Sequence, residues 1–338
     1  MRNTHEMGRW ALPLLLAALL ALAPASARPV AAQETSIRLA GTPLELVGTP
    51  DSLWVLTCDR GCSGEGRRSV GRIVRIDPRE GRVRASVPVS RPHAIAVSSS
   101  GVYAVDFWRD TVLRLDPRTL RTTARLRLVL PFEVVPGDDA FLPFDITVGR
   151  NAVWVSTARG ALARVDLRVS RVVAMVRLRV KGGEIAVADG AVWLAEGLGG
   201  VYRVDPSTNR VSARIRIGPP TGRLAVDRPL VGGGKVLAVG SWTRGDVLTG
   251  RRGLARIDPR RNRLEAVTPL RSGPLAVAFG KGSLWSARVG GSTVERIEAR
   301  TGKLVGRFRA DDVRALAVAG GAVWIATRDG TIGRLGTP

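Results

Sequence analysis

Apolar and polar residues follow one another along this chain in an arrangement that returns seven times. An apolar triplet is followed by a turn, then by an apolar run centred on one large residue, then by an Arg-apolar-acid step and a second turn. The large central residues are Trp54, Tyr103, Trp154, Trp193, Leu237, Trp285 and Trp324. The Arg-apolar-acid steps begin at Arg75, Arg114, Arg164, Arg203, Arg256 and Arg296, and the last repeat stops at Arg334-Leu335. Repeats of about 40 residues built from short strands indicate a stack or a ring of small sheets.

One repeat, residues 184–217, shows the expected elements. Its segments are, in order, Glu184–Val187, the turn Asp189-Gly190, Ala191–Ala195, Val201–Asp205 and Arg210–Ile217. Asp-Gly is a hairpin turn signal, and the alternating last segment is typical of a half-exposed strand. We name the four strands of a repeat A, B, C and D. Four antiparallel strands in a meander predict one blade of a β-propeller, with D at the outer edge.

The two ends of the chain complement each other. The last repeat stops after its strand C, and Ser36–Gly41 resembles strand D of other repeats, such as Arg214–Gly218. An N-terminal strand that completes the last blade would close the ring and protect the strand edges. The sequence therefore predicts an all-β, seven-bladed β-propeller of four-stranded antiparallel blades, formed by residues 33–338 as a single domain, with the last blade closed by the N-terminal strand.

The repeated large residues and arginines are expected to belong to the framework of the blades. A large ring at one place in each strand B suits packing between neighbouring blades. The repeated arginine of strand C is expected to make an ion pair or a hydrogen bond to a carbonyl between blades.

Residues 1–32 are expected to be a cleaved signal peptide. Arg2 and Arg9 precede an apolar run, Trp10–Ala23, and small residues allow cleavage after Ala27 or Ala32. The run is shorter than the roughly 20 residues that span a bilayer, and no later segment is apolar enough to cross one. These features predict a Sec-exported monomer in the periplasm, the cell envelope or the medium.

The charge balance is strongly basic. The chain carries 52 Lys and Arg against 29 Asp and Glu, a net charge of +23. The signal segment holds three arginines and one glutamate, so the mature protein keeps +21. This charge attracts anionic partners such as acidic polymers, although an arginine-rich composition explains it equally well. No nucleic acid is expected as a partner, because export separates the protein from it and aromatic residues are not interleaved with the arginines. The two cysteines, Cys58 and Cys62, predict a local disulfide.

The long connections predict where a site lies. B–C and D–A connections share one face of a propeller, and most long segments are of this kind: residues 57–70, 128–144 and 240–253. A longer A–B turn, residues 227–235, is expected on the opposite face. We call the B–C/D–A side the working face, because long loops on a rigid scaffold tend to carry binding residues. The candidates at its channel mouth and loops are His93, Asp106, Trp108, Asp145, Glu184, Glu196, Arg223, Trp242, Arg288 and Arg314, beside Glu45.

Two kinds of chemistry are open at this mouth. His93 is a candidate general base, with Asp106 or Asp145 as the acid that orients it. Asp145 and Glu184 are candidate ligands for Mg²⁺ or Ca²⁺, which prefer carboxylate oxygens. The alternative is an ordinary polar, solvated channel.

The repeats resemble those of exported seven-bladed propellers of the YVTN type and of the streptogramin B lyase group. The resembling residues are Ile185–Gly190, Val192–Glu196, Arg203–Pro206 and Pro92–Ile95, and the likeness covers residues 36–336. The resemblance implies a propeller fold and, for the lyase group, elimination at an ester linkage by a histidine, a glutamate and magnesium. In that group the histidine lies in a late blade, whereas no histidine follows His93 here.

Three functions follow as hypotheses. The first is an exported binding or interaction module for a small molecule, a peptide or an envelope polymer. The second is a lyase or hydrolase with a metal in the channel. The third is binding to anionic envelope polymers through arginines such as Arg118, Arg168 and Arg260 on the C–D turns.

Overall fold

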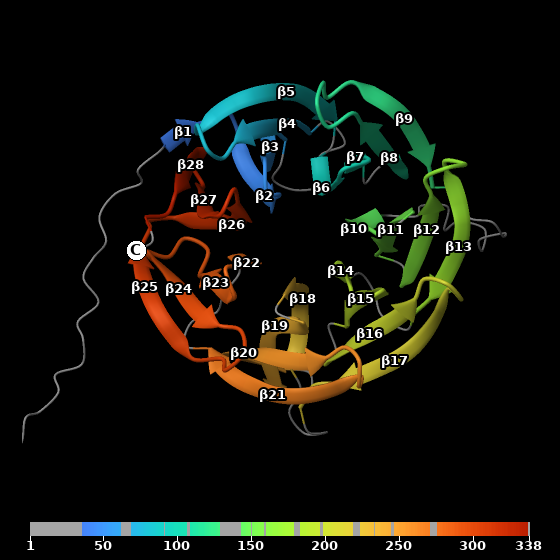
Figure 1. Cartoon of the computed structure of the whole chain (residues 1–338), viewed down its shortest axis with the longest axis vertical. Coiled ribbons are helices and arrows are strands. Elements are labelled where there is room, and N and C mark those ends of the chain that lie inside the picture. The colour runs from blue at the N-terminus through green and yellow to red at the C-terminus, as the bar shows by residue number, and fades with distance from the viewer. Residues whose placement is uncertain are drawn as a thin grey trace, which may run out of the picture.

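The fold is seen in a computed structural model of the chain (Figure 1). It describes residues 36–61, 69–90, 92–106, 109–128, 143–149, 151–158, 160–178, 183–196, 199–218, 224–232, 234–244, 247–270 and 276–336. These residues form 28 β-strands, arranged as seven four-stranded antiparallel sheets around a central axis. The all-β, seven-bladed propeller expected from the repeats is confirmed.

Each blade runs from an inner strand A to an outer strand D. The first three blades are β2 (Thr42–Gly48), β3 (Leu53–Arg60), β4 (Val70–Asp77), β5 (Arg82–Ser90); β6 (Pro92–Ser98), β7 (Gly101–Asp106), β8 (Thr111–Leu115), β9 (Thr122–Arg127); and β10 (Pro143–Val148), β11 (Ala152–Thr157), β12 (Ala161–Asp166), β13 (Arg171–Arg177). The next three are β14 (Ile185–Ala188), β15 (Ala191–Glu196), β16 (Gly200–Asp205), β17 (Arg210–Arg216); β18 (Leu224–Gly232), β19 (Lys235–Arg244), β20 (Val247–Asp258), β21 (Arg263–Leu270); and β22 (Ala276–Gly280), β23 (Ser283–Ala287), β24 (Thr293–Glu298), β25 (Leu304–Arg309).

The seventh blade is built from both ends of the chain. It consists of β26 (Val313–Ala319), β27 (Ala322–Thr327), β28 (Thr331–Arg334) and, as its outer strand, β1 (Ser36–Arg38). Ile37 of β1 pairs with Ile332 of β28, and the Arg38 guanidinium lies 3.1 Å from the Asp329 carboxylate. The predicted closure by the N-terminal strand is confirmed, and Figure 1 shows β1 beside β28.

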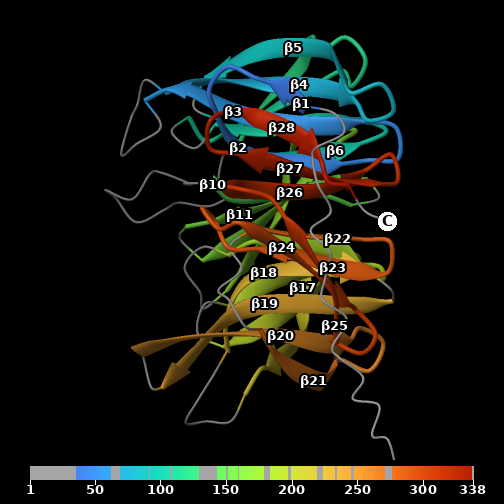
Figure 2. The ribbon, with the colours of Figure 1, turned by 90° about the vertical axis from the view of Figure 1, so that its left-hand side faces the viewer.

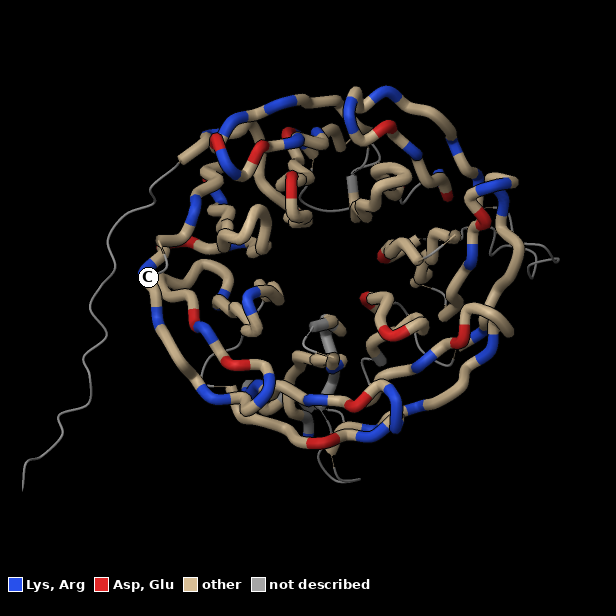
Figure 3. The backbone as a smooth tube through the Cα atoms, in the orientation of Figure 1, with Lys and Arg blue, Asp and Glu red and all other residues tan. Residues whose placement is uncertain are grey.

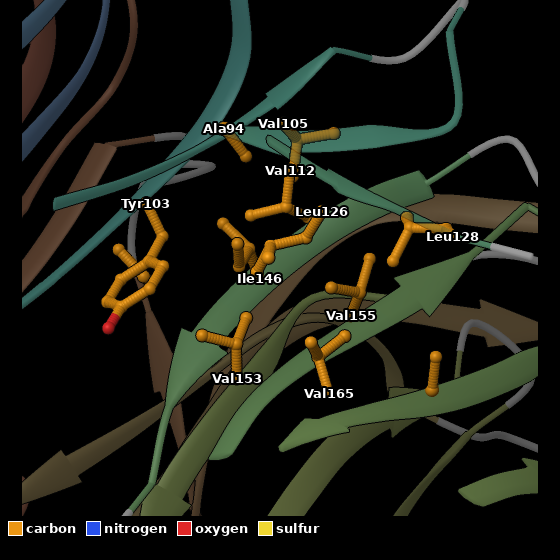
Figure 4. Close-up of a cluster of buried hydrophobic side chains, with 12 residues drawn as sticks. Ala94, Tyr103, Val105, Val112, Leu126, Leu128, Ile146, Val153, Val155 and Val165 are labelled. Carbon is orange, nitrogen blue, oxygen red and sulfur yellow. The ribbon is translucent and has the colours of Figure 1, made fainter. Parts of the chain in front are cut away.

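The core consists of layers between neighbouring blades. One cluster joins Tyr103 and Leu126 of the second blade to Ile146 and Val153 of the third, as Figure 4 shows. Trp154, Trp193, Trp285 and Trp324 are almost fully buried. Burying one large side chain contributes up to about 3 kcal/mol, so these layers stabilise each blade against the next. The framework role expected for the strand-B aromatic residues is confirmed.

The strand-C arginines connect blades at the opposite side from the working face. The Arg75 guanidinium donates to the Pro117 carbonyl of the next blade at 3.2 Å. In the third blade, Arg164 donates to the Pro206 carbonyl at 2.8 Å. The guanidinium of Arg164 also stacks on the ring of Trp154, 5.8 Å from its centroid. The expected inter-blade hydrogen bonds are confirmed for these two arginines.

Two further expectations concern export and redox state. Cys58 is disulfide-bonded, while Cys62 and the predicted signal peptide lie outside the described residues. Within the described ranges, no helix has the length and hydropathy that crossing a membrane requires.

Candidate functional site

Four of the inner strands have a β-bulge near their start, at the working face. The register between strands A and B shifts at Pro43/Glu45 in the first blade and at Pro143/Asp145 in the third. The same shift occurs between Pro92 and Ile95 in the second blade and at Val313/Ala315 in the seventh. Such bulges re-aim side chains. Inner strands are also edge strands, with N–H and C=O groups that their own sheet leaves unpaired.

Polar side chains at these bulges bond to the backbone of the next blade. The Glu45 carboxylate accepts from the Ile95 N–H at 2.9 Å, and Asp145 Oδ2 accepts from the Ile185 N–H at 2.7 Å. The Arg314 Nε donates to the Pro43 carbonyl at 2.9 Å. His93 forms a similar bond to the third blade, described below. Hydrogen bonds of this kind therefore connect the seventh blade to the first, the first to the second, the second to the third and the third to the fourth.

Asp145 lies at the centre of a buried network. Its residue is only 8% exposed, and its backbone N–H donates to Ser156 Oγ at 3.1 Å. Ser156 Oγ in turn donates to the Gly183 carbonyl at 2.6 Å. A side chain at Gly183 is excluded, because its Cβ would lie 2.4 Å from the Ala195 carbonyl oxygen. The network therefore fixes the start of the fourth blade against the third.

His93 occupies the bulge of the second blade. It is exposed at the channel, and its ring meets the ring of Phe144 edge-on, with centroids 5.8 Å apart. Desolvation of the imidazole by the surrounding protein lowers the pKa of His93 below its ordinary value. A hydrogen bond to the Phe144 backbone opposes part of this shift. The imidazole is thus mainly neutral at pH 7, as a general base must be.

The remaining mouth candidates differ in exposure. Asp106 is buried at the end of β7, with Arg109 Nε 4.0 Å from its carboxylate. Glu184 is half-buried, and its carbonyl accepts from the Ala195 N–H. Arg288 is exposed, beyond the end of β23. The central opening is rimmed by positions of both signs (Figure 3).

Some predicted residues cannot be placed. Trp108 and Arg223 lie outside the described residues, and the side chain of Glu196 does too, although its backbone ends β15. The described residues contain no group of three or more His, Cys, Asp or Glu arranged to hold a metal ion. A site for Mg²⁺ or Ca²⁺ at Asp145 and Glu184 therefore stays a prediction.

Two expectations about the fifth blade were wrong. Residues 240–253 were expected to form a long loop, but most of them extend the hairpin β19–β20, which pairs out to Arg244 and Val247. Residues 227–235 were expected to form a long turn, but β18 continues to Gly232 and β19 starts at Lys235. The β-branched residues Val247 and Thr249 were the overlooked strand signal.

Trp242 lies at the base of this hairpin. It is half-buried and packs against the cluster that joins the fourth and fifth blades. Its carbonyl accepts from Thr249 Oγ1 at 2.9 Å. Trp242 therefore supports the hairpin. The exposed side chains near it are Thr249 and Arg251 at its own level and Arg244 nearer the tip.

Comparison with known proteins supports the fold alone. The chain matches no protein-family model and no curated protein. Among solved structures it is similar to the hydrazine synthase of Kuenenia stuttgartiensis, with a TM-score of 0.68 and 13% identity over 90% of this chain and 99% of that chain. It is also similar to BamB from Moraxella catarrhalis, with a TM-score of 0.58 and 14% identity over 90% of this chain and 99% of that chain.

Proposed function

We propose that this protein is an exported binding or interaction module that acts through its working face. The observation that carries the proposal is the β19–β20 hairpin. In the fourth blade, pairing of strands B and C ends at Glu196 and Gly200, three residues past Trp193. In the fifth blade it continues to Arg244, seven residues past the equivalent Leu237. Four extra residues lengthen a strand by about 13 Å.

The projecting hairpin suits recognition because it stands on a rigid base. Figure 2 shows β19 and β20 projecting on one side of the ring. Pairing in the first blade reaches nearly as far, since β3 pairs with β4 out to Arg60, six residues past Trp54. The base is held by the buried cluster between the fourth and fifth blades, against which Trp242 packs. A preorganised surface loses less conformational entropy on binding than a mobile loop does.

The proposal is tested by altering the hairpin tip alone. We expect Arg244→Glu with Arg251→Glu to abolish retention of a partner by the immobilised mature protein, since Arg244 lies at the tip, Arg251 lies at the level of Trp242, and both side chains are exposed. Arg118→Glu with Arg210→Glu makes the same change of charge on the opposite face and should leave retention intact. If both variants lose the partner equally, or if both retain it, the hairpin tip is not the binding site and the proposal is wrong.

Export is the other part of the proposal. It is supported by the basic start and apolar run of residues 1–32. N-terminal sequencing of the protein recovered outside the cytoplasm should begin at Arg28 or Gln33. An intact N-terminus on a cytoplasmic protein would contradict export.

A second candidate, a lyase or hydrolase in the channel mouth, is favoured by one observation. The lowered pKa of His93 leaves a neutral imidazole at pH 7, beside the tied carboxylates of the inner strands. Calorimetric titration with Mg²⁺ and Ca²⁺ tests it, with Asp145→Asn and Glu184→Gln as variants. Saturable binding lost in the variants would support this candidate, and no binding would remove its metal-dependent form.

A further inference from the structure

Three outer strands end in arginines that stand in register. In each of the second, third and fourth blades, the last residue of strand D lies opposite the first residue of strand C. These pairs are Arg127 with Thr111, Arg177 with Ala161 and Arg216 with Gly200. All three arginines are exposed, so they occupy the same level of the outer wall, at its edge with the working face.

Two further arginines extend this level. Arg125 and Arg214 precede Arg127 and Arg216 by two residues, on the same side of their strands, and both are exposed. Residues two apart on a strand are separated by about 6.6 Å. We call these five residues, Arg125, Arg127, Arg177, Arg214 and Arg216, the rim arginines. Figure 3 shows the basic positions along β9, β13 and β17, which form one side of the ring.

Some arginines elsewhere on the blades are paired with carboxylates. At the C–D end, Arg84 of β5 lies 3.0 Å from Asp77, and Arg168 of the C–D turn lies 3.0 Å from Asp166. The outer strand of the sixth blade is similar, since Arg307 lies 3.2 Å from Glu295.

Three of the rim arginines have no carboxylate partner within the described residues. Within the described part of the chain, Arg125, Arg127 and Arg216 form no ion pair. The guanidinium of Arg214 lies over the ring of Tyr202, 5.5 Å from its centroid. Within the described residues, no ion pair therefore compensates the charge of these three rim arginines, and the same holds for Arg121, Arg171 and Arg210 at the other end of the blades.

We propose that the rim arginines bind a flexible linear polyanion with repeated phosphate groups. Arginine suits this ligand, because its planar guanidinium bonds to two oxygens of one phosphate at once. The arc follows a convex wall over three adjacent blades, joined by the clusters between β9 and β10 and between β12 and β15. A flexible chain follows such a wall, whereas a flat membrane touches it along one line. This site goes beyond the proposed function and does not depend on it.

The matched test uses two triple variants of the mature protein. Arg127→Gln, Arg177→Gln and Arg216→Gln removes charge from the rim. Arg121→Gln, Arg171→Gln and Arg210→Gln removes the same charge from the other end of the same three blades, where these side chains are also exposed. The probe is long-chain inorganic polyphosphate, titrated by fluorescence anisotropy at several salt concentrations, after thermal melting shows that both variants fold.

The rim variant should bind polyphosphate at least about tenfold more weakly. The slope of log K against log salt should fall by about 2, since each phosphate contact on a single-stranded polyanion contributes about 0.7. The control variant should bind nearly as the parent does. Equal losses in both variants would show an effect of net charge alone, and unchanged binding in both would show that the rim takes no part. Tighter, rim-dependent binding to vesicles of phosphatidylglycerol would replace the polymer by a membrane. Each of these three results overturns the proposal.

Discussion

A serine two residues before the strand-B aromatic decides whether the strand-C arginine is fully bonded. Arg75 Nε donates to Ser52 Oγ at 2.9 Å, and Arg296 Nε donates to Ser283 Oγ at 3.0 Å. Alanine stands at the equivalent position in two other blades, Ala152 and Ala191. There the Nε atoms of Arg164 and Arg203 are buried without a hydrogen-bond partner. A single missing hydroxyl thus explains the unsatisfied donors.

This difference predicts opposite effects for two substitutions. Ala152→Ser supplies the missing acceptor for Arg164 and should raise the free energy of unfolding by about 1 kcal/mol. Ser52→Ala leaves the Nε of Arg75 buried without an acceptor and should lower it by about 1–3 kcal/mol. Urea unfolding of both variants measures these changes. An unaffected Ser52→Ala protein would contradict the role given to the serine.

The carboxylate of Asp145 predicts a second pair of variants. Asp145→Ala removes the acceptor of the buried Ile185 N–H, and we expect a loss of about 1.5–3 kcal/mol. Asp145→Asn keeps an acceptor oxygen and should lose less than half as much. Thermal unfolding of the metal-free protein compares them. Equal losses would show that the negative charge matters, not the hydrogen bond to the next blade.

At the scale of the element, the C–D turns of the first five blades are each held by the aspartate that precedes the turn. Asp77 Oδ1 accepts from the backbone N–H groups of Arg79 and Glu80. Equivalent bonds lower the pKa of Asp116 and Asp258. At Asp205 a hydrogen bond from the Ser207 hydroxyl lowers the pKa most, followed by the bond from the Ser207 backbone N–H. Hydrogen bonds from the Arg168 side chain and backbone lower the pKa of Asp166 to about 2.

These turns predict a loss of stability in acid. A carboxyl whose pKa is lower in the folded than in the unfolded chain stabilises the fold above its unfolded pKa of about 3.9. The contribution is lost as the pH falls through the folded value, about 2 for Asp166. The melting temperature of the parent should therefore fall between about pH 5 and about pH 2, and Asp166→Asn should show a smaller fall. A difference between the two proteins that does not change with pH would contradict this cause.

We expect deletion of the short strand β1 to reduce the stability of the whole ring, although the strand has only three residues. Its residues Ser36–Arg38 complete the seventh blade, and Leu39 N–H donates to the Gly330 carbonyl. Removing residues 33–39 leaves β28 as an exposed outer edge, and such edges promote pairing between molecules. We expect a lower melting temperature and oligomers in size-exclusion chromatography. A monomer with unchanged stability would show that closure is dispensable.

For the whole molecule, the sequence predicted the ring better than the site. The seven large strand-B residues and the unfinished last repeat specify blades and closure, because both depend on local periodicity. The tie from Asp145 to Ile185 depends on two blades 40 residues apart, and no local pattern shows it. Residues 43–46 and 143–146 share the order Pro-apolar-acid-apolar, which hinted at a common role. Residues 240–253 were expected to form a loop because glycines and arginines interrupt the apolar pattern of β19 and β20.

We propose that the working face binds a partner while the backbone of the ring below it stays rigid. Hydrogen–deuterium exchange of the mature protein, with and without a partner captured on it, measures this most directly. We expect protection in the tip of β19–β20 and at the starts of β2, β6 and β10, with unchanged exchange in the C–D turns. Protection confined to the C–D turns, with none in the hairpin, would contradict it.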